Sequence, residues 1–189
     1  MCAENIFVDE LSIEPCHKTM TMTFQKGLNY LKGQNGSGKT MLLDYVAGIR
    51  NDQKQRISGN ENIVYINQNI FFADRLTGTD FVKFVYRLDN KSRERFDIDK
   101  KVDVKTLMEK QWGLLSGGER KYLYSMVLLS LDREWYILDE PFAYLDTEKK
   151  EILWKVIEAF ASEGKGVILT PHEEDSRING SDIHVINLD

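Results

Sequence analysis

The chain has 189 residues, and its 25 Lys and Arg against 30 Asp and Glu give a formal net charge of −5. This acidic balance argues against a nucleic-acid binder, which needs a basic field to pair with phosphates, and the 42% share of hydrophobic residues excludes a wholly disordered chain. Two cysteines are too few for a disulfide framework, no uncharged apolar run approaches the roughly 20 residues that cross a bilayer, and residues 1–5 do not resemble a secretory signal. We therefore expect a cytosolic protein of one domain, with or without an inserted lobe.

Short β-rich apolar runs alternate with helical patterns along the chain, which is typical of an α/β domain with a largely parallel sheet. The expected strands are residues 6–8, 28–31, 63–66, 135–138, 167–169 and 183–188. Apolar residues at helical spacing predict helices over 41–49, 81–88 and 152–160, and Asp146 or Thr147 can cap the last. The charge-rich residues 70–110 contain no strong strand run, which predicts a small, mostly helical lobe inserted in the domain.

Residues 33–40 read Gly-Gln-Asn-Gly-Ser-Gly-Lys-Thr and match the phosphate-binding pattern G-x-x-x-x-G-K-[ST], between an expected strand and an expected helix. Its glycines let the backbone direct several N–H groups at a triphosphate, and the helix N-terminus adds the positive end of a dipole. Lys39 can reach the β- and γ-phosphates, and the Thr40 hydroxyl can bind Mg²⁺. The predicted nucleotide-binding residues in this loop are Asn35, Gly36, Ser37, Gly38, Lys39 and Thr40.

The apolar run 135–138 ends in two carboxylates, Asp139 and Glu140. A buried strand would bring Asp139 to the carboxyl edge of the sheet, beside the phosphate loop, where it can hold the Mg²⁺ shell. Glu140 is then placed to orient and polarise an attacking water, and a positioned general base is worth roughly 10²–10⁴ in rate. Strands often end in acidic residues, so this pair indicates chemistry only together with the phosphate loop.

Ser116, Gly117, Gly118 and Glu119 precede another helical pattern. Ser116 with Glu119 is a capping box, a common helix start, but a capping box does not explain two consecutive glycines, which lower helix propensity. Ser116 and the N–H groups of Gly117 and Gly118 can instead form a second anion site at a helix N-terminus. One triphosphate does not easily need two such sites from one chain, so the second site would serve the nucleotide of another chain.

With these motifs the chain resembles, almost end to end, the ATP-binding subunits of ABC (ATP-binding cassette) transporters. Residues 33–40 resemble the family's Walker A, residues 135–140 its Walker B with the catalytic glutamate, and residues 115–119 its signature. Three further matches follow the family's order: Gln68 resembles the Q-loop glutamine, residues 143–146 the D-loop, and His172 the switch histidine.

The resemblance implies roles for these residues. Catalysis is assigned to Glu140, Gln68 and His172, and Mg²⁺ binding to Thr40, Gln68 and Asp139. It also implies a Mg²⁺-dependent ATPase in which Walker A of one chain and the signature of another enclose ATP head to tail. The dimer would be a homodimer, or a heterodimer with a related cassette. Transmembrane permease subunits would carry the cargo and hold this cytoplasmic chain at the inner face of the cell membrane, and no nucleic acid is expected as a partner.

The implied fold is a P-loop NTPase core with a mostly parallel sheet, an N-terminal antiparallel β part and an inserted small helical subdomain. A single ABC ATPase domain would span 1–189, with a core formed by 1–68 and 111–189 and a helical subdomain at 69–110. Residues 12–19 depart from the family because they lack the aromatic, often Tyr, that stacks on adenine, and His17 is the available substitute.

Aromatic residues near Gln68 are candidates for contact with a permease. We expect Phe81 and Phe84 inside the helical lobe and Phe71 or Phe72 at the contact. On resemblance alone we favour an exporter-like system, since the short chain leans away from sugar importers. The alternative is a soluble ABC-type ATPase that is not coupled to transport, for example in iron–sulfur assembly. A P-loop kinase would leave the signature and Glu140 unexplained.

Overall fold

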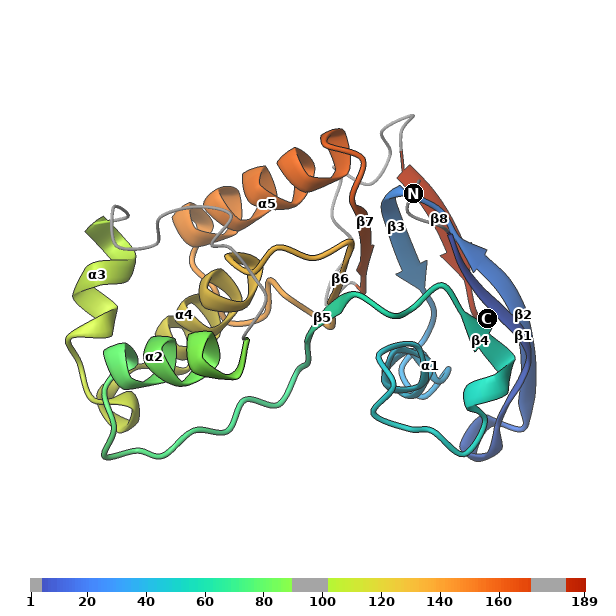
Figure 1. The fold of residues 1–189 in the computed structure, drawn as a ribbon, viewed down its shortest axis with the longest axis horizontal. Coiled ribbons are helices and arrows are strands. Elements are labelled where there is room, and N and C mark those ends of the chain that lie inside the picture. The colour runs from blue at the N-terminus through green and yellow to red at the C-terminus, as the bar shows by residue number, and fades with distance from the viewer. Residues whose placement is uncertain (1–4, 90–101, 171–182) are drawn as a thin grey trace.

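The computed structural model describes residues 5–89, 102–170 and 183–189 (Figure 1). Its helices are α1 (Lys39–Val46), α2 (Gly78–Leu88), α3 (Val102–Met108), α4 (Gly117–Leu129) and α5 (Thr147–Ser162). Its strands are β1 (Ile6–Ile13), β2 (Lys18–Phe24), β3 (Gly27–Lys32), β4 (Ile57–Ser58), β5 (Ile63–Ile66), β6 (Trp135–Leu138), β7 (Gly166–Leu169) and β8 (Ile183–Asn187).

These strands form two sheets. The larger has the order β5-β6-β7-β3-β8, and every pair of neighbours in it is parallel. The smaller has the order β2-β1-β4 and is antiparallel. The expected α/β class, with a mostly parallel sheet and an N-terminal antiparallel part, is confirmed.

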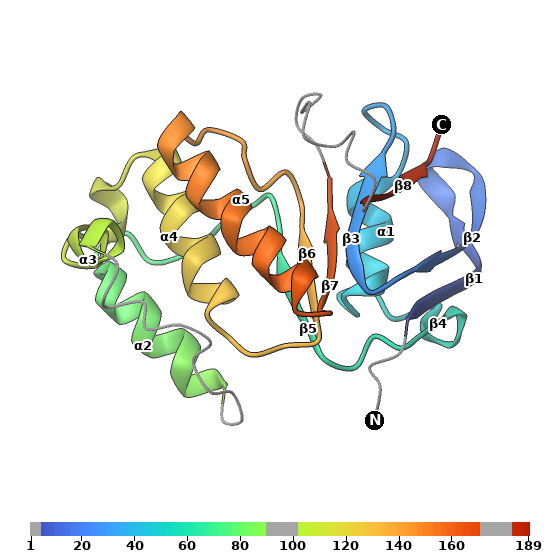
Figure 2. The same cartoon turned by 90° about the horizontal axis from the view of Figure 1, so that it is seen from above.

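The helices lie on both faces of the parallel sheet. Helix α1 lies between the two sheets, and α4 and α5 cover the opposite face (Figure 2). The side chains of β6 alternate accordingly: Tyr136 and Leu138 pack toward the core of α2 to α5, whereas Trp135 and Ile137 pack toward the core around α1. All four are buried, as is typical of a strand covered on both faces. Because the strands are parallel, the carboxyl ends of β3, β5 and β6 meet at one edge.

Strand β2 and the end of α1 differ from the sequence prediction. In β2 threonines alternate with methionines, so a search for continuous apolar runs misses it, although Met20 and Phe24 are buried. The helix predicted over 41–49 ends at Val46 instead. Gly48 has a φ of 73°, a left-handed conformation that ends helices, and Ile49 beyond it is 69% exposed.

The predicted helical lobe contains α2 and α3, which pack on each other and on α4. Phe81 of α2 packs against Trp112 with ring centroids 5.0 Å apart and ring planes tilted by 49°, and both belong to one continuous core with α4, α5 and the sheet. The boundaries 1–68, 69–110 and 111–189 therefore stay a prediction.

Two helices begin at side-chain caps. The Asp146 carboxylate accepts a hydrogen bond from Lys149 N at 2.9 Å, which confirms the expected cap of α5. Thr77 and Asp80 form a capping box at α2: Thr77 Oγ1 accepts from Asp80 N at 3.2 Å, and Asp80 Oδ2 accepts from Thr77 N at 2.8 Å. No helix within the described ranges is long and apolar enough to cross a membrane.

Replacing Thr77 by Ala should lower the free energy of unfolding by about 1 kcal/mol, because the N-cap acceptor of α2 is lost. Thr77→Ser keeps the hydroxyl and should retain most of the stability. Urea unfolding followed by circular dichroism measures both variants. Equal losses in Ala and Ser would contradict the cap and assign the loss to the threonine methyl group.

Candidate functional site

The phosphate loop joins β3 to α1 and wraps around its own lysine. Gly36 and Gly38 have φ values of 84° and 98°, which favour glycine. Gly38 is the N-cap of α1, and a side chain at Gly36 would meet no atom within 4 Å, so the loop is open there. Lys39 Nζ donates to Gly33 O at 2.6 Å and to Gln34 O at 3.0 Å. The loop thus has what a phosphate cradle requires: a tight backbone turn that its glycines permit, and the positive charge of Lys39.

Asp139 lies at the carboxyl end of β6, beside this loop, and is only 2% exposed. Its Oδ2 accepts a hydrogen bond from Thr40 Oγ1 at 2.8 Å, and its Oδ1 accepts one from Thr170 Oγ1 at 2.7 Å. The structure therefore brings together Thr40 and Asp139, the hydroxyl and carboxylate assigned to Mg²⁺ from the sequence.

Glu140 follows directly and has a φ of 47°, an uncommon conformation for a non-glycine residue. Its N–H donates to Thr170 Oγ1 at 2.8 Å, and its Oε2 accepts from Gln68 Nε2 at 3.0 Å. Gln68, two residues after β5, thus contacts Glu140, the candidate base, although the two are 72 positions apart in the sequence. Strain of this kind concentrates at functional sites.

The donor set suits a nucleoside triphosphate with a hard cation. Ser37 Oγ is buried and has no hydrogen-bond partner within the described part of the chain, so a loop donor remains for a ligand oxygen. Thr40, Asp139 and Gln68 offer oxygen atoms, which Mg²⁺ prefers. Gln68 Nε2 donates to Glu140 Oε2, and the assignment of Gln68 to Mg²⁺ stays a prediction.

The signature segment forms the capping box that opens α4. Ser116 Oγ accepts from Glu119 N at 3.2 Å, and Glu119 Oε2 accepts from Ser116 N at 2.7 Å. Lys110 and the Ser116 N–H together lower the pKa of Glu119 to about 2. A Cβ at Gly118 would lie 2.4 Å from Tyr144 O in the predicted D-loop, whereas one at Gly117 meets nothing within 4 Å. Contact within the chain therefore explains Gly118, and the anion-site interpretation of this segment stays a prediction.

Sequence reasoning missed two residues of this site, Thr170 and Lys121. Thr170 is a polar residue directly after β7, which is a weak signal. Lys121 is 4% exposed, and only its place in a helix opening with the signature hinted at a role. His172, the predicted switch histidine, lies outside the described residues. His17, the possible adenine contact, is exposed and next to Cys16, whose Sγ lies 3.0 Å from a Cβ placed on Gly38.

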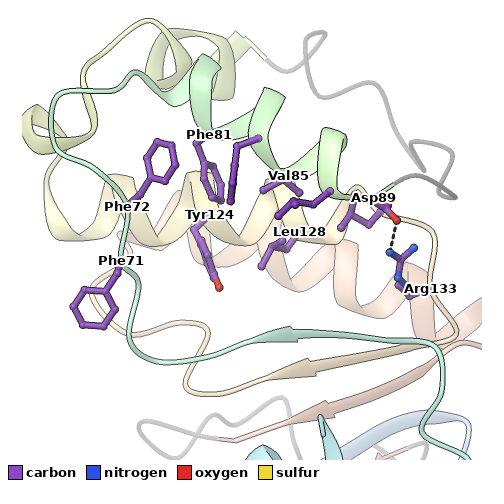
Figure 3. A pocket seen from close by; sticks show the side chains of 11 residues that line it. Phe71, Phe72, Phe81, Val85, Asp89, Tyr124, Leu128 and Arg133 are labelled. Atoms are coloured by element: carbon purple, nitrogen blue, oxygen red, sulfur yellow. Dashed lines mark hydrogen bonds and ion pairs between the residues drawn. The ribbon is translucent and has the colours of Figure 1, made fainter. Parts of the chain in front are cut away.

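A second candidate site is a cavity of about 420 Å³ between α2, α4 and the segment after β5 (Figure 3). Phe71 is 90% exposed at one end, and the Asp89–Arg133 ion pair, at 2.6 Å, lies at the other. Tyr124 and Leu128 of α4 line the wall between them.

The aromatic residues around this cavity divide into buried and exposed positions differently from the prediction. Phe81 is internal as expected, but Phe84 is 51% exposed, so its assignment to the lobe's interior is wrong. Phe81, Phe84 and Val85 of α2 all line the cavity, but Phe81 and Val85 are buried there, whereas Phe84 is not. Phe72 packs against Trp112 with centroids 5.4 Å apart, which leaves Phe71 as the exposed candidate for a contact.

Comparisons with known proteins agree with this arrangement. A family model described as ABC transporter matches residues 17–143. An energy-coupling factor transporter ATP-binding protein from Thermotoga maritima is 32% identical over 82% of this chain and 66% of its own. A cytochrome c biogenesis ATP-binding export protein from Haemophilus influenzae is 28% identical over 90% of this chain and 87% of its own. A solved structure of a putative ABC transporter ATP-binding protein from Pyrococcus furiosus has a TM-score of 0.76 and 25% identity, covering 98% of both chains.

The fold and the loop define a P-loop nucleotide-binding domain. Because the family model matches more than half of the chain, the protein belongs to the ABC transporter family and resembles its ATP-binding subunits. The family assignment made from the sequence motifs is confirmed. The matched regions amount to 66%, 39% and 36% of the lengths of three curated relatives, so the chain spans only part of some of them.

Gly118→Ala should destabilise the protein by about 1–3 kcal/mol, because its methyl group would displace the Tyr144 carbonyl. Gly117→Ala is the matched control: it makes the same change one residue earlier in open space and should leave the free energy of unfolding within about 0.5 kcal/mol. Urea unfolding measures both. Equal stability of the two variants would contradict the packing of the signature on the D-loop.

Proposed function

We propose that this chain is an ATP-hydrolysing subunit that drives a membrane transporter. The observation that carries the proposal is the convergence of the phosphate loop, the Thr40–Asp139 pair and the Gln68–Glu140 pair at one edge of the parallel sheet. A phosphate cradle beside a buried carboxylate and an amide-bound carboxylate is what hydrolysis of a nucleoside triphosphate needs.

In this mechanism Lys39 and the loop N–H groups bind the phosphate oxygens and stabilise the charge that develops on them. Thr40 and Asp139 would hold Mg²⁺, which would supply further charge neutralisation. Glu140 orients the attacking water and accepts its proton, while the Gln68 amide, which donates to Oε2, keeps the carboxylate in place.

The proposed assembly is a head-to-tail homodimer, or a heterodimer with a related cassette. Ser116, Gly117 and Gly118 would contact the ATP held by the other chain's loop, and His172 keeps its proposed catalytic role. A helix N-terminus that carries a hydroxyl and unpaired N–H groups supports this role.

The proposed location is the cytoplasmic face of a membrane, beside permease subunits. The Haemophilus influenzae relative, which matches over most of both chains, is named an export protein, and this supports export as our proposed direction. A zinc import ATP-binding protein from Anaplasma marginale is also similar, but it matches over 60% of its own length. The alternative of a soluble ATPase uncoupled from transport has no observation in its favour.

Glu140→Gln should reduce multiple-turnover ATP hydrolysis by at least about 10²-fold, because the general base is removed while the cradle remains. The variant should bind ATP normally and run as an ATP-dependent dimer on a sizing column, whereas Lys39→Ala should bind ATP weakly and stay monomeric. Glu61→Gln, at an exposed carboxylate outside the site, is the control and should hydrolyse ATP at the wild-type rate. Wild-type hydrolysis by Glu140→Gln would refute the assignment of the base.

The cavity beside Phe71 is the proposed permease contact. Its apolar walls suit a short amphipathic helix that inserts apolar side chains. Phe71→Asp should therefore reduce co-purification with membrane subunits at least about tenfold and leave ATP hydrolysis by the isolated chain unchanged. Ile49→Asp makes the same kind of change at a 69% exposed position outside the cavity and should not affect co-purification. Equal recovery of membrane subunits with Phe71→Asp would argue against docking at this cavity.

A further inference from the structure

Lys121 is a buried cation that the mechanism above does not use. It lies in the second turn of α4 and is 4% exposed. Its Nζ donates to Asn67 O and to Asp139 O, each at 3.3 Å. Burial lowers the pKa of Lys121, and the negative charges of Asp139 and Glu140 oppose that shift. A methionine would fill similar space without the cost of burying charge, so what the ammonium adds is its donors and its charge.

Both acceptors belong to the peptide units that lead into the proposed catalytic side chains. The Asn67 carbonyl is bonded to the nitrogen of Gln68, and the Asp139 carbonyl to the nitrogen of Glu140. The Lys121 ammonium group therefore holds the backbone directly before Gln68, whose amide orients the base, and directly before Glu140, the base itself.

The peptide between Asp139 and Glu140 is held at both of its polar ends. Its carbonyl accepts from Lys121 Nζ at 3.3 Å, and its N–H donates to Thr170 Oγ1 at 2.8 Å. Glu140 directly follows with a φ of 47°, a strained conformation that persists only where surrounding contacts impose it. Lys121 of α4 and Thr170, directly after β7, are two contacts that fix this peptide plane.

We propose that Lys121 is a positioning residue for ATP hydrolysis: it fixes the peptides before Gln68 and Glu140 so that the amide and the carboxylate face the reacting water. The proposal rests on the roles given above to Gln68 and Glu140. Binding of ATP by the phosphate loop does not involve Lys121, so its loss affects the chemical step and not the affinity for nucleotide.

Lys121→Met tests the proposal because it keeps the length of the side chain and removes its charge and donors. We expect kcat to fall about ten- to hundredfold, as for a displaced general base, while KM and the ATP Kd from calorimetry stay within about twofold. Lys121→Arg keeps the charge and donors and should recover part of the lost kcat. Lys105→Met, the same substitution at an exposed position of α3, is the matched control and should leave all three values unchanged.

A second pair of variants separates this proposal from the proposed function. In the Glu140→Gln background, Lys121→Met should still form the ATP-dependent dimer, since cradle and signature are intact. If wild type hydrolyses ATP and Glu140→Gln traps the dimer, yet Lys121→Met turns over at the wild-type rate, only the role of Lys121 is refuted. A matching loss of ATP affinity would also refute it.

Thermal unfolding by circular dichroism shows whether each variant folds. If Lys121→Met does not fold, Lys121→Gln, which keeps a donor but not the charge, takes its place. Its kcat should fall at least about threefold with unchanged KM, and a wild-type kcat would overturn the proposal.

Discussion

The buried carboxylate of Asp139 is the constraint around which this site is organised. A charge removed from water is tolerated only when hydrogen bonds and opposite charge compensate it. Thr40, at the start of α1, and Thr170, after β7, each donate to one of its oxygens, across 99 and 31 positions of sequence. The hydrogen bonds of this one carboxylate therefore fix the positions of the phosphate loop, β6 and β7 relative to one another. They also place the Thr40 hydroxyl beside the Asp139 carboxylate.

The position of Glu140 follows from the same contacts. Thr170 Oγ1 donates to Asp139 and accepts from the Glu140 N–H, so a single hydroxyl serves both acidic residues. On the other side of that peptide Lys121 holds the Asp139 carbonyl. The strained backbone of Glu140 is thus determined by residues from two other elements, and the carboxylate projects toward Gln68.

The parts of this structure that could be predicted from the sequence are those whose signal is local. The loop at 33–40 and the strand before Asp139 were predictable because spacing and apolar runs specify them directly. Gln68 was assigned to the site only through the order of the family's motifs, and its contact with Glu140 was not predicted. Lys121 and Thr170 could not be found, because their roles depend on which strands neighbour one another.

Side-chain direction was the other limit of the sequence. A helical period identifies α2, but it does not say which of its apolar side chains the neighbouring elements cover, and Phe84 was therefore misplaced. Gly118 was predicted to bind a phosphate, whereas its close contact with the Tyr144 carbonyl already requires a residue without Cβ there. Both cases depend on packing between elements that are distant in sequence.

The capping box of α4 and an anion site at the same helix end are compatible, because they use different atoms. Ser116 Oγ accepts from Glu119 N through a lone pair, which leaves its O–H proton for an external oxygen. The Ser116 N–H is already bound to Glu119 Oε2, and Lys110 together with this hydrogen bond lowers the pKa of that carboxyl group to about 2. The donors that remain are the Ser116 hydroxyl and the N–H groups of Gly117 and Gly118, which have no intrahelical partner. Glu119 thus orders the serine and at the same time limits which groups the ATP phosphates of the proposed head-to-tail dimer would meet.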